Sequence, residues 1–262
     1  MSRNLGMCTA ALLADPMNAD AAEIAAAGDA AVAAGFREAS VWSFQLDALA
    51  ASALRVTVVE AAMAWAGDDP IAADAEAEHY VALVERYGAS VVLAVTMEPS
   101  IADPAEARRR LGALAARVAP LGAQVCVEFF GWSAVHSLRV AWELVEPLGR
   151  DVGLVLDTFH WQRQPGGPDH ALLASIPGER IGFVQLADAA PEPLGPIEAE
   201  AMTARLLPGD GVVDFARFFG VLDEIGADPF LATEVFNTRL VAERGAAGAA
   251  VAMRDAAGAI VP

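Results

Sequence analysis

Four oxygen-bearing side chains lie at the ends of short apolar runs: Glu128, Asp157, Gln185 and Glu234. Carboxylates are almost never buried among apolar neighbours without a partner. Three carboxylates brought together with an amide oxygen would repel one another unless a cation lay between them. Hard divalent ions prefer such oxygen donors, so the set predicts one metal ion: magnesium or manganese first, then cobalt. Zinc is less expected, because the set contains no thiolate or imidazole.

Each of these residues also has a simpler interpretation. Glu128 or Glu234 could form an ion pair with an arginine. Asp157 could cap the helix that follows it, and Gln185 could be an ordinary buried amide with hydrogen-bond partners. The metal hypothesis therefore depends on the four side chains converging in space.

His160 follows Asp157 by three residues, between Phe159 and Trp161. At the rim of an active site it could act as a general acid or base. Because the reference pKa of histidine is about 6.5, the sequence predicts that His160 titrates near neutral pH. A structural role for a lone histidine is the alternative.

Further residues could contact a substrate in the same place. Trp42 lies near the end of the second apolar run, and Glu60 and Trp65 lie near the end of the third. Arg205, in a long Pro- and Gly-rich connection, could pair with a carboxylate or phosphate of the substrate, or could be a surface arginine. Long connections in compact domains are usually functional.

The elements that must position these residues alternate between apolar runs and alanine-rich helical patterns. The predicted strands lie near 4–9, 37–42, 54–60, 90–96, 123–130, 152–157, 181–187 and 230–236. The helical patterns lie near 19–34, 43–52, 71–87, 104–119, 133–147, 168–175, 213–225 and 239–257. Eight such units favour a single α/β domain over residues 1–262, a closed (β/α)8 TIM barrel with its active site at the C-terminal strand ends. The alternative is an open doubly wound sheet, but no glycine-rich phosphate-binding turn follows the first run.

Composition excludes several classes of function. With 55% hydrophobic and 20% charged residues in 262 positions, the chain can bury a large core. The formal net charge of −18 argues against nucleic acid as a partner. The sequence contains no lysine, which rules out Schiff-base, pyridoxal-phosphate and P-loop chemistry. Cys8 and Cys126 are expected in the core. No apolar run is long enough for a membrane span or a signal peptide, so we expect a soluble cytoplasmic protein, with homo-oligomerisation left open.

Several motifs resemble those of the xylose-isomerase-like TIM-barrel superfamily of sugar phosphate isomerases and epimerases, which includes hydroxypyruvate isomerase, inosose dehydratase and 3-dehydroshikimate dehydratase. The matching segments are Val-Glu-Phe at 127–129, Leu-Asp-Thr-Phe-His at 156–160, Val-Gln-Leu-Ala-Asp at 184–188, Arg-Leu-Leu-Pro-Gly-Asp-Gly at 205–211 and Thr-Glu-Val-Phe-Asn at 233–237. The resemblance implies metal ligands at Glu128, Asp157, Gln185 and Glu234, with His160 and Arg205 beside the substrate. Many sugar epimerases carry histidine where this chain has Gln185, and glutamine is more similar to the hydroxypyruvate-isomerase and dehydroshikimate-dehydratase branches.

Three functions follow as hypotheses. The first is a metal-dependent isomerase or epimerase of a small hydroxy-carbonyl compound, in which Glu128 and Glu234 move a proton through an enediolate. The second is a dehydratase of the 3-dehydroshikimate type, in which His160 removes the α-proton and a β-hydroxyl leaves. The third is a barrel that binds a ligand without catalysis.

Overall fold

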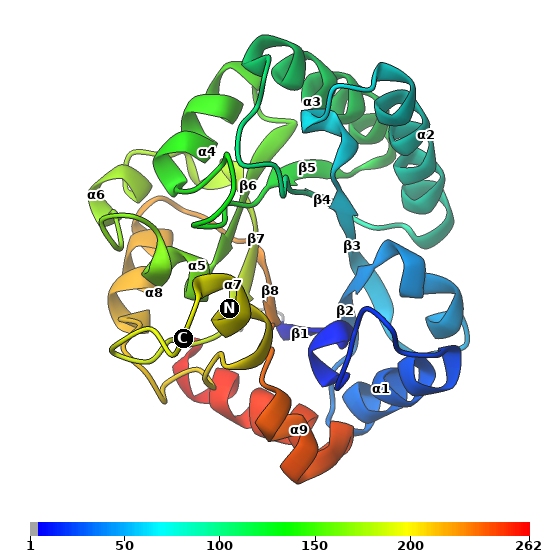
Figure 1. Cartoon of the computed structure of the whole chain (residues 1–262), viewed down its shortest axis with the longest axis vertical. Coiled ribbons are helices and arrows are strands. Elements are labelled where there is room, and N and C mark those ends of the chain that lie inside the picture. Colours follow the sequence, from blue (N-terminus) through cyan, green and yellow to red (C-terminus); the bar gives the residue numbers. More distant parts are fainter. Residues whose placement is uncertain (1–4) are drawn as a thin grey trace.

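The strands close into a barrel. The computed structural model describes residues 5–262, and in it β1 to β8 follow one another around a closed parallel ring (Figure 1). Their bounds are β1 Leu5–Cys8, β2 Glu38–Trp42, β3 Arg55–Ala62, β4 Val91–Ala94, β5 Gln124–Val127, β6 Val152–Asp157, β7 Ile181–Leu186 and β8 Phe230–Thr233. The ring closes where β1 pairs with β8, with Leu5 opposite Leu231. The predicted TIM barrel is confirmed.

The strand interior explains why polar residues gather at one end. Val155, Phe183 and Ala232 belong to one buried cluster, to which β3, β4 and β5 also contribute residues. Side chains two positions apart on a strand face the same side. The next residues on this side are therefore Asp157, Gln185 and Glu234, which lie one layer nearer the C-terminal strand ends. The barrel thus has an apolar interior layer beneath a polar one.

Helices surround the ring and start at clear capping residues. Their bounds are α1 Ala21–Ala33, α2 Pro70–Tyr87, α3 Pro104–Val118, α4 Leu138–Val145, α5 Thr158–Arg163, α6 His170–Leu173, α7 Ile197–Thr203, α8 Phe215–Glu224 and α9 Thr238–Ile260. Asp20 and Glu23 form the predicted capping box of α1, and Asp103 caps α3 ahead of Pro104. None of the helices described for residues 5–262 is long and apolar enough to cross a membrane.

Several predicted boundaries were too generous. The predicted strand 230–236 stops at Thr233, and the predicted strand 123–130 covers only Gln124–Val127. In both segments the strand pairing ends where the side chains turn into the barrel mouth. The predicted helix 133–147 begins only at Leu138, because Ser133 holds a turn and Ser137 provides the cap. The segment predicted as helix 43–52 is a 3-10 helix over Ser43–Leu49.

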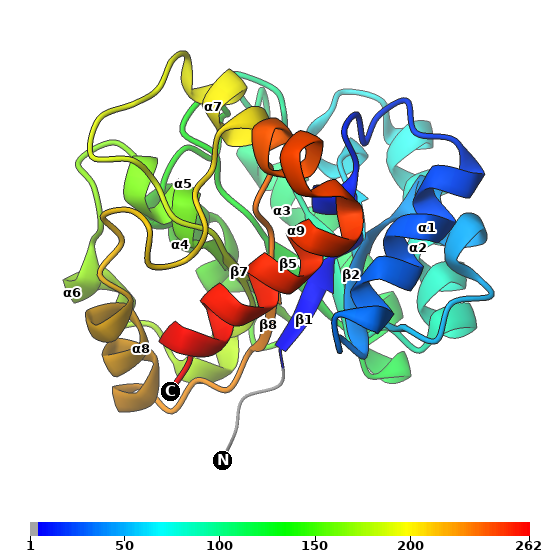
Figure 2. The same cartoon turned by 90° about the horizontal axis from the view of Figure 1, so that it is seen from below.

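One buried carboxylate makes several hydrogen bonds to the long connection after β7. Asp188 is fully buried and accepts hydrogen bonds from the backbone N–H groups of Ala189, Gly209, Gly211 and Val213 at 2.8–3.0 Å. Figure 2 shows α7, which lies within this connection, above one end of the barrel. The connection is therefore an ordered part of the barrel mouth.

Candidate active site

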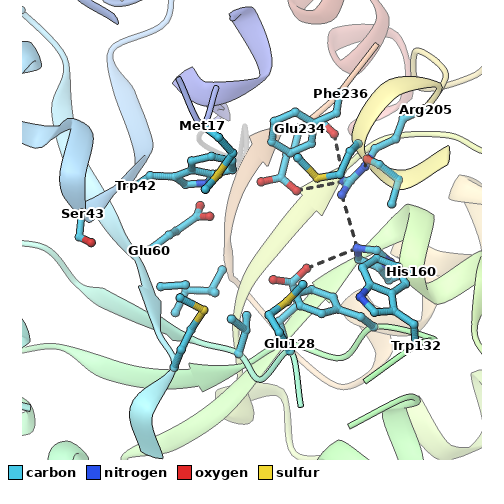
Figure 3. A pocket seen from close by; sticks show the side chains of 18 of the residues that line it. Met17, Trp42, Ser43, Glu60, Glu128, Trp132, His160, Arg205, Glu234 and Phe236 are labelled. Carbon is cyan, nitrogen blue, oxygen red and sulfur yellow. Dashed lines mark hydrogen bonds and ion pairs between the residues drawn. The ribbon is translucent and has the colours of Figure 1, made fainter. Parts of the chain in front are cut away.

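A cavity of about 480 Å³ opens at the C-terminal ends of the strands. Glu128, Glu234, His160, Arg205 and Glu60 line it together with many apolar side chains (Figure 3). The place is the one that the barrel architecture predicts for chemistry.

Arg205 joins two of the predicted metal ligands. Its Nη1 donates to Asp157 Oδ2 at 2.6 Å and to Glu234 Oε2 at 3.0 Å. Its Nε donates to the carbonyl of Ala201 at 2.6 Å, and the whole side chain is buried. Arg205 is therefore not a surface arginine, and its guanidinium offsets part of the negative charge of the cluster.

The backbone fixes Arg205 in this position. Its N–H donates to the carbonyl of Phe236, just after β8, and its own carbonyl accepts from the side chain of Asn237. The neighbouring Leu206 pairs with Asp188 at the end of β7. The guanidinium is thereby held between the ends of β7 and β8.

Gln185 leaves a buried oxygen without a partner. Its Nε2 donates to Glu234 Oε1 at 2.7 Å, whereas its Oε1 has no hydrogen-bond partner. A buried polar atom without a partner is costly, and an orphaned amide oxygen inside an acidic cluster is a suitable donor for a hard cation. The residues present therefore fit the predicted divalent ion. In addition, donor atoms of Glu128, Asp157 and His160 lie within 4.8 Å of one another and can form a buried metal site.

The carboxylates of the cluster differ in their proton affinity. Burial, followed by repulsion from Glu234 and Asp157, raises the pKa of Glu128 well above its usual range. Burial likewise raises the pKa of Glu234, although Arg205 opposes the change. Burial would also raise the pKa of Asp157, but Arg205 and His160 outweigh it and the net pKa is lowered. The negative charge of ionised Glu128 is thus the least compensated of the three, and a bound cation would stabilise it most.

His160 is held as a neutral imidazole. Burial lowers its pKa to about 3, so the expectation that it titrates near neutral pH was wrong. Its Nε2 lies 3.9 Å from Glu128 Oε1 and 3.4 Å from Arg205 Nη2. Arginine can only donate, so the contact with Arg205 assigns the Nε2 lone pair as acceptor. The ring packs against Phe130 and Trp132, with centroids 4.9 and 5.3 Å away.

Asp157 also caps α5, as the simpler interpretation of its role predicts. Its Oδ1 accepts the backbone N–H of His160 at 3.0 Å. The other oxygen, Oδ2, accepts from Arg205. One aspartate thereby orients the backbone of His160 and takes part in the acidic cluster.

Glu60 and Cys8 form the opposite side of the polar layer. Glu60 accepts from the hydroxyl of Ser40, and burial raises its pKa to about 7. Donor atoms of Cys8, Glu60 and Glu234 lie within 4.8 Å of one another. Both cysteines are buried and free, as expected, but nothing in the residue pattern indicated that Cys8 would lie beside site residues.

The other predicted substrate contacts divide into two groups. Trp42, Glu60 and Arg205 line the cavity, whereas Trp65 does not and lies beside α2 and α3 in two smaller hollows. Trp132 and Phe130 line the cavity beyond β5 but were not predicted to do so. A signal was present, because both lie within four residues after Glu128, at a strand end.

Comparison with known proteins defines the class. The family described as "Xylose isomerase-like TIM barrel" matches residues 13–256, and the chain belongs to this family. The family includes sugar epimerases and dehydratases.

Named relatives cover only part of the chain. A 3-dehydroshikimate dehydratase of Pseudomonas aeruginosa is 33% identical over 165 residues, which make up 62% of this chain and 26% of that relative. The chain thus matches about a quarter of the length of that protein. An inosose dehydratase of Yersinia enterocolitica is 28% identical over 131 residues, 46% of this chain and 44% of the relative. Among solved structures, the protein IOLI with a bound zinc atom has a TM-score of 0.81 at 19% identity, over 100% of this chain and 98% of that one, which shows a shared fold.

Proposed function

We propose that this protein is a divalent-metal-dependent dehydratase that removes water from a hydroxy-ketone. The observation that carries the proposal is the buried neutral His160, whose acceptor Nε2 faces the cavity beside Glu128. A neutral imidazole is a competent base, whereas an imidazolium would have no lone pair to offer. The named relatives support the same reaction type, because the proteins described above from Pseudomonas and Yersinia are both dehydratases.

The metal would be held by Glu128, Asp157, Gln185 and Glu234. When bound, a divalent ion supplies a Lewis acid for the carbonyl oxygen and a counter-charge for the enolate. The residue types favour magnesium, manganese or cobalt over zinc, on the grounds given for the oxygen donors.

The residues of the chain then account for the proton transfers. His160 Nε2 removes the proton from the carbon beside the carbonyl, and the electron pair of that bond passes to the carbonyl oxygen. When the enolate collapses, the bond to the β-hydroxyl breaks, and the imidazolium returns the proton so that water leaves. Asp157 stabilises the transient imidazolium, because its charge raises the proton affinity of the ring. Arg205 keeps Asp157 ionised for this purpose.

The second candidate is a metal-dependent isomerase or epimerase. It is favoured by one observation: Glu128 and Glu234 directly follow β5 and β8, and both line the cavity (Figure 3). One carboxylate could remove a proton from one face of the substrate while the other returns a proton to the opposite face. The third hypothesis, binding without catalysis, has no observation in its favour, because oxygen donors occupy all four predicted ligand positions.

The experiment that tests the proposal follows two products with the manganese-loaded protein. Hydroxy-ketones, among them 3-dehydroshikimate, an inosose and the uncharged β-hydroxy-ketone 4-hydroxy-4-phenylbutan-2-one, are incubated in deuterium oxide. Loss of water is followed by mass spectrometry and, for 3-dehydroshikimate, by new ultraviolet absorbance. Loss of water supports the dehydratase, whereas deuterium incorporation with interconversion of isomers supports the second candidate. Neither water loss nor deuterium uptake, for every ketone tested, would overturn both.

A further inference from the structure

The polar layer of the cavity carries an excess of negative charge. Glu60, Glu128 and Glu234 line it, and Asp157 lies against Arg205 directly behind them. When all four carboxyl groups are ionised, one guanidinium and one divalent ion leave one carboxylate charge without compensation. A substrate that brought a further negative charge into this low-dielectric space would be repelled.

Arg205 is largely committed to the residues around it. Of its five N–H donors, those of Nε and Nη1 are engaged by Ala201, Asp157 and Glu234, and one N–H of Nη2 contacts His160, which leaves a single N–H. Among the residues described as lining the cavity, Arg205 is also the only arginine. A carboxylate or phosphate of the substrate, predicted opposite Arg205, would therefore meet a guanidinium whose charge Asp157 and Glu234 already offset.

Above the polar layer the walls are apolar. Trp42 packs against Phe44 and Phe236 on one side, with ring centroids 5.7 and 5.9 Å apart. Phe130 stacks on Trp132 on the other side at 5.2 Å and an interplanar angle of 17°. Figure 3 shows Trp42 and Phe236 across the cavity from Trp132. The two aromatic walls leave a space between them that suits a flat apolar group.

The rim continues this apolar surface into solvent. Met17, Met63 and Met97 line the cavity and are 64, 49 and 57% exposed. Exposed apolar side chains grouped around a cavity mark a binding site, and methionine adapts to irregular ligands. In contrast, Ser43 carries the only hydroxyl among the described lining residues. A ligand with many hydroxyl groups would bury several of them without partners.

We infer that the substrate is an uncharged hydroxy-ketone that bears an apolar group of about ring size. This inference rests on the proposed function for the hydroxy-ketone part, which meets the polar layer, while the apolar group lies between the aromatic walls. The cavity of about 480 Å³ has room for both parts, since pockets of about 300–1,000 Å³ hold drug-sized ligands. Free sugars and sugar phosphates fit this arrangement less well, the first for lack of polar partners and the second for their charge.

Three related probes separate the contributions of charge and apolar area. α-Hydroxyacetophenone is a neutral hydroxy-ketone with a phenyl ring, hydroxyacetone replaces the ring by a methyl group, and the para-carboxylate of α-hydroxyacetophenone adds one negative charge. Binding to the manganese-loaded protein is measured by calorimetry. We expect the phenyl compound to bind about 10-fold or more tightly than hydroxyacetone, and the carboxylate about 10-fold or more weakly than the phenyl compound.

Variants assign the effects to the named residues. Trp42→Ala and the rim variant Met97→Ala should weaken binding of the phenyl compound and leave hydroxyacetone unchanged. Glu60→Gln should improve binding of the carboxylate relative to the neutral phenyl compound. Ile71→Ala is the control, because Ile71 is 79% exposed on α2 and does not line the cavity. Met97 is exposed, so its variant should fold even if Trp42→Ala does not.

The outcomes separate the inference from the proposed function. Equal or tighter binding of the carboxylate, or of hydroxyacetone, would overturn the inference. The proposed function is read separately, from deuterium uptake at the α-carbon of the same probes by nuclear magnetic resonance. Uptake with the reverse order of affinities contradicts the inference alone. The expected order of affinities without uptake at the α-carbon of any probe counts against the proposed function alone.

Discussion

The two ends of the Gln185 amide have different environments. The Nε2 group is used by Glu234, whereas the Oε1 atom is buried without a partner. Because an amide cannot change its charge, its oxygen can serve a cation at any pH. An imidazole in the same place would compete with protons and would be a softer donor.

Replacing Gln185 tests this difference directly. Gln185→His should retain metal binding and shift the preference from magnesium and manganese toward cobalt or zinc. The measurement is the ranking of dissociation constants for the four ions. An unchanged ranking would show that Gln185 is not a ligand. Gln164→His is a matched control, because Gln164 is also buried but bonds to Leu138 and Trp161 outside the cluster.

For His160, the structure predicts a loss of turnover without a loss of metal. His160→Ala should reduce turnover by about 100-fold or more, the usual effect of removing a general acid or base. Metal affinity, measured by titration calorimetry, should stay within a few fold. Loss of the metal would instead make His160 a ligand. His79→Ala, on the exposed face of α2, should behave as wild type.

Glu60 gives the metal-free protein a pH-dependent stability. Its folded-state pKa of about 7 lies above the ordinary value of 4.5, so the folded protein holds this proton more tightly than the unfolded chain. The contribution to stability is therefore full below pH 4.5 and is lost as the pH rises through 7. Glu60→Gln mimics the protonated form. At pH 8 it should therefore raise the free energy of unfolding by up to about 3 kcal/mol and raise Tm accordingly, whereas at pH 4.5 both should change little. Equal shifts at both pH values would contradict this, and Glu78→Gln on the surface is the control.

Residue types alone indicated most of the candidate site, because carboxylates at the ends of apolar runs are out of place in a core. They could not indicate partners. The bonds of Arg205 to Asp157 and Glu234 depend on the path of the connection that carries Arg205. Hydrogen bonds to Asp188 help to set that path, and residue types do not reveal them. The pKa of His160 could not be read either, since burial determines it.

At the scale of elements, the connection between β7 and α8 decides where Arg205 lies. Asp188 accepts four backbone hydrogen bonds from this connection and pairs with Leu206 through its main chain. The turn at Gly209 has a φ of +93°, which glycine adopts readily. Asp188 is thus a main anchor of the segment, together with Asn237, which donates to the carbonyl of Arg205.

Removing that carboxylate should release the connection. Asp188→Ala removes the acceptor of four backbone N–H groups, two of them in the buried residues Ala189 and Val213, and should cost on the order of 3 kcal/mol of unfolding free energy. Limited proteolysis should then cut within residues 190–212, and turnover should fall because Arg205 loses its support. Asp210→Ala is the control, since Asp210 is exposed in the same connection. Resistance to protease equal to wild type would contradict the role given to Asp188.

The strands were easier to predict than the helices. Buried parallel strands read as continuous apolar runs, and all eight lie where those runs predicted them. The short helices α5 and α7 were missed, because six or seven residues carry too little periodicity to be recognised. The apolar runs did not show where each strand ends, because the end depends on hydrogen bonds to the neighbouring strands.

For the whole molecule, metal binding should appear as stability. An ion that binds only the folded protein adds about 2.7 kcal/mol when present at about 100 times its Kd. For a chain of this size that corresponds to a rise in Tm of about 5–10 °C. Differential scanning calorimetry with manganese and with a chelator measures it. Glu234→Gln should reduce the rise, and no rise in the wild type would contradict the metal site.

The closure of the ring has a consequence for synthesis on the ribosome. β1 pairs with β8 through Met7 and Thr233, so the backbone edge of β1 stays unpaired until β8 has been translated. At about 5–20 residues per second, that wait lasts roughly 10–45 s. During this time β1 has an unpaired backbone edge, which can recruit strands of other nascent chains. The candidate site is also divided between the two ends of the message, because Glu234 is translated after nearly everything else. A chain truncated before β8 would therefore lack both the final seam of the barrel and part of its proposed chemistry.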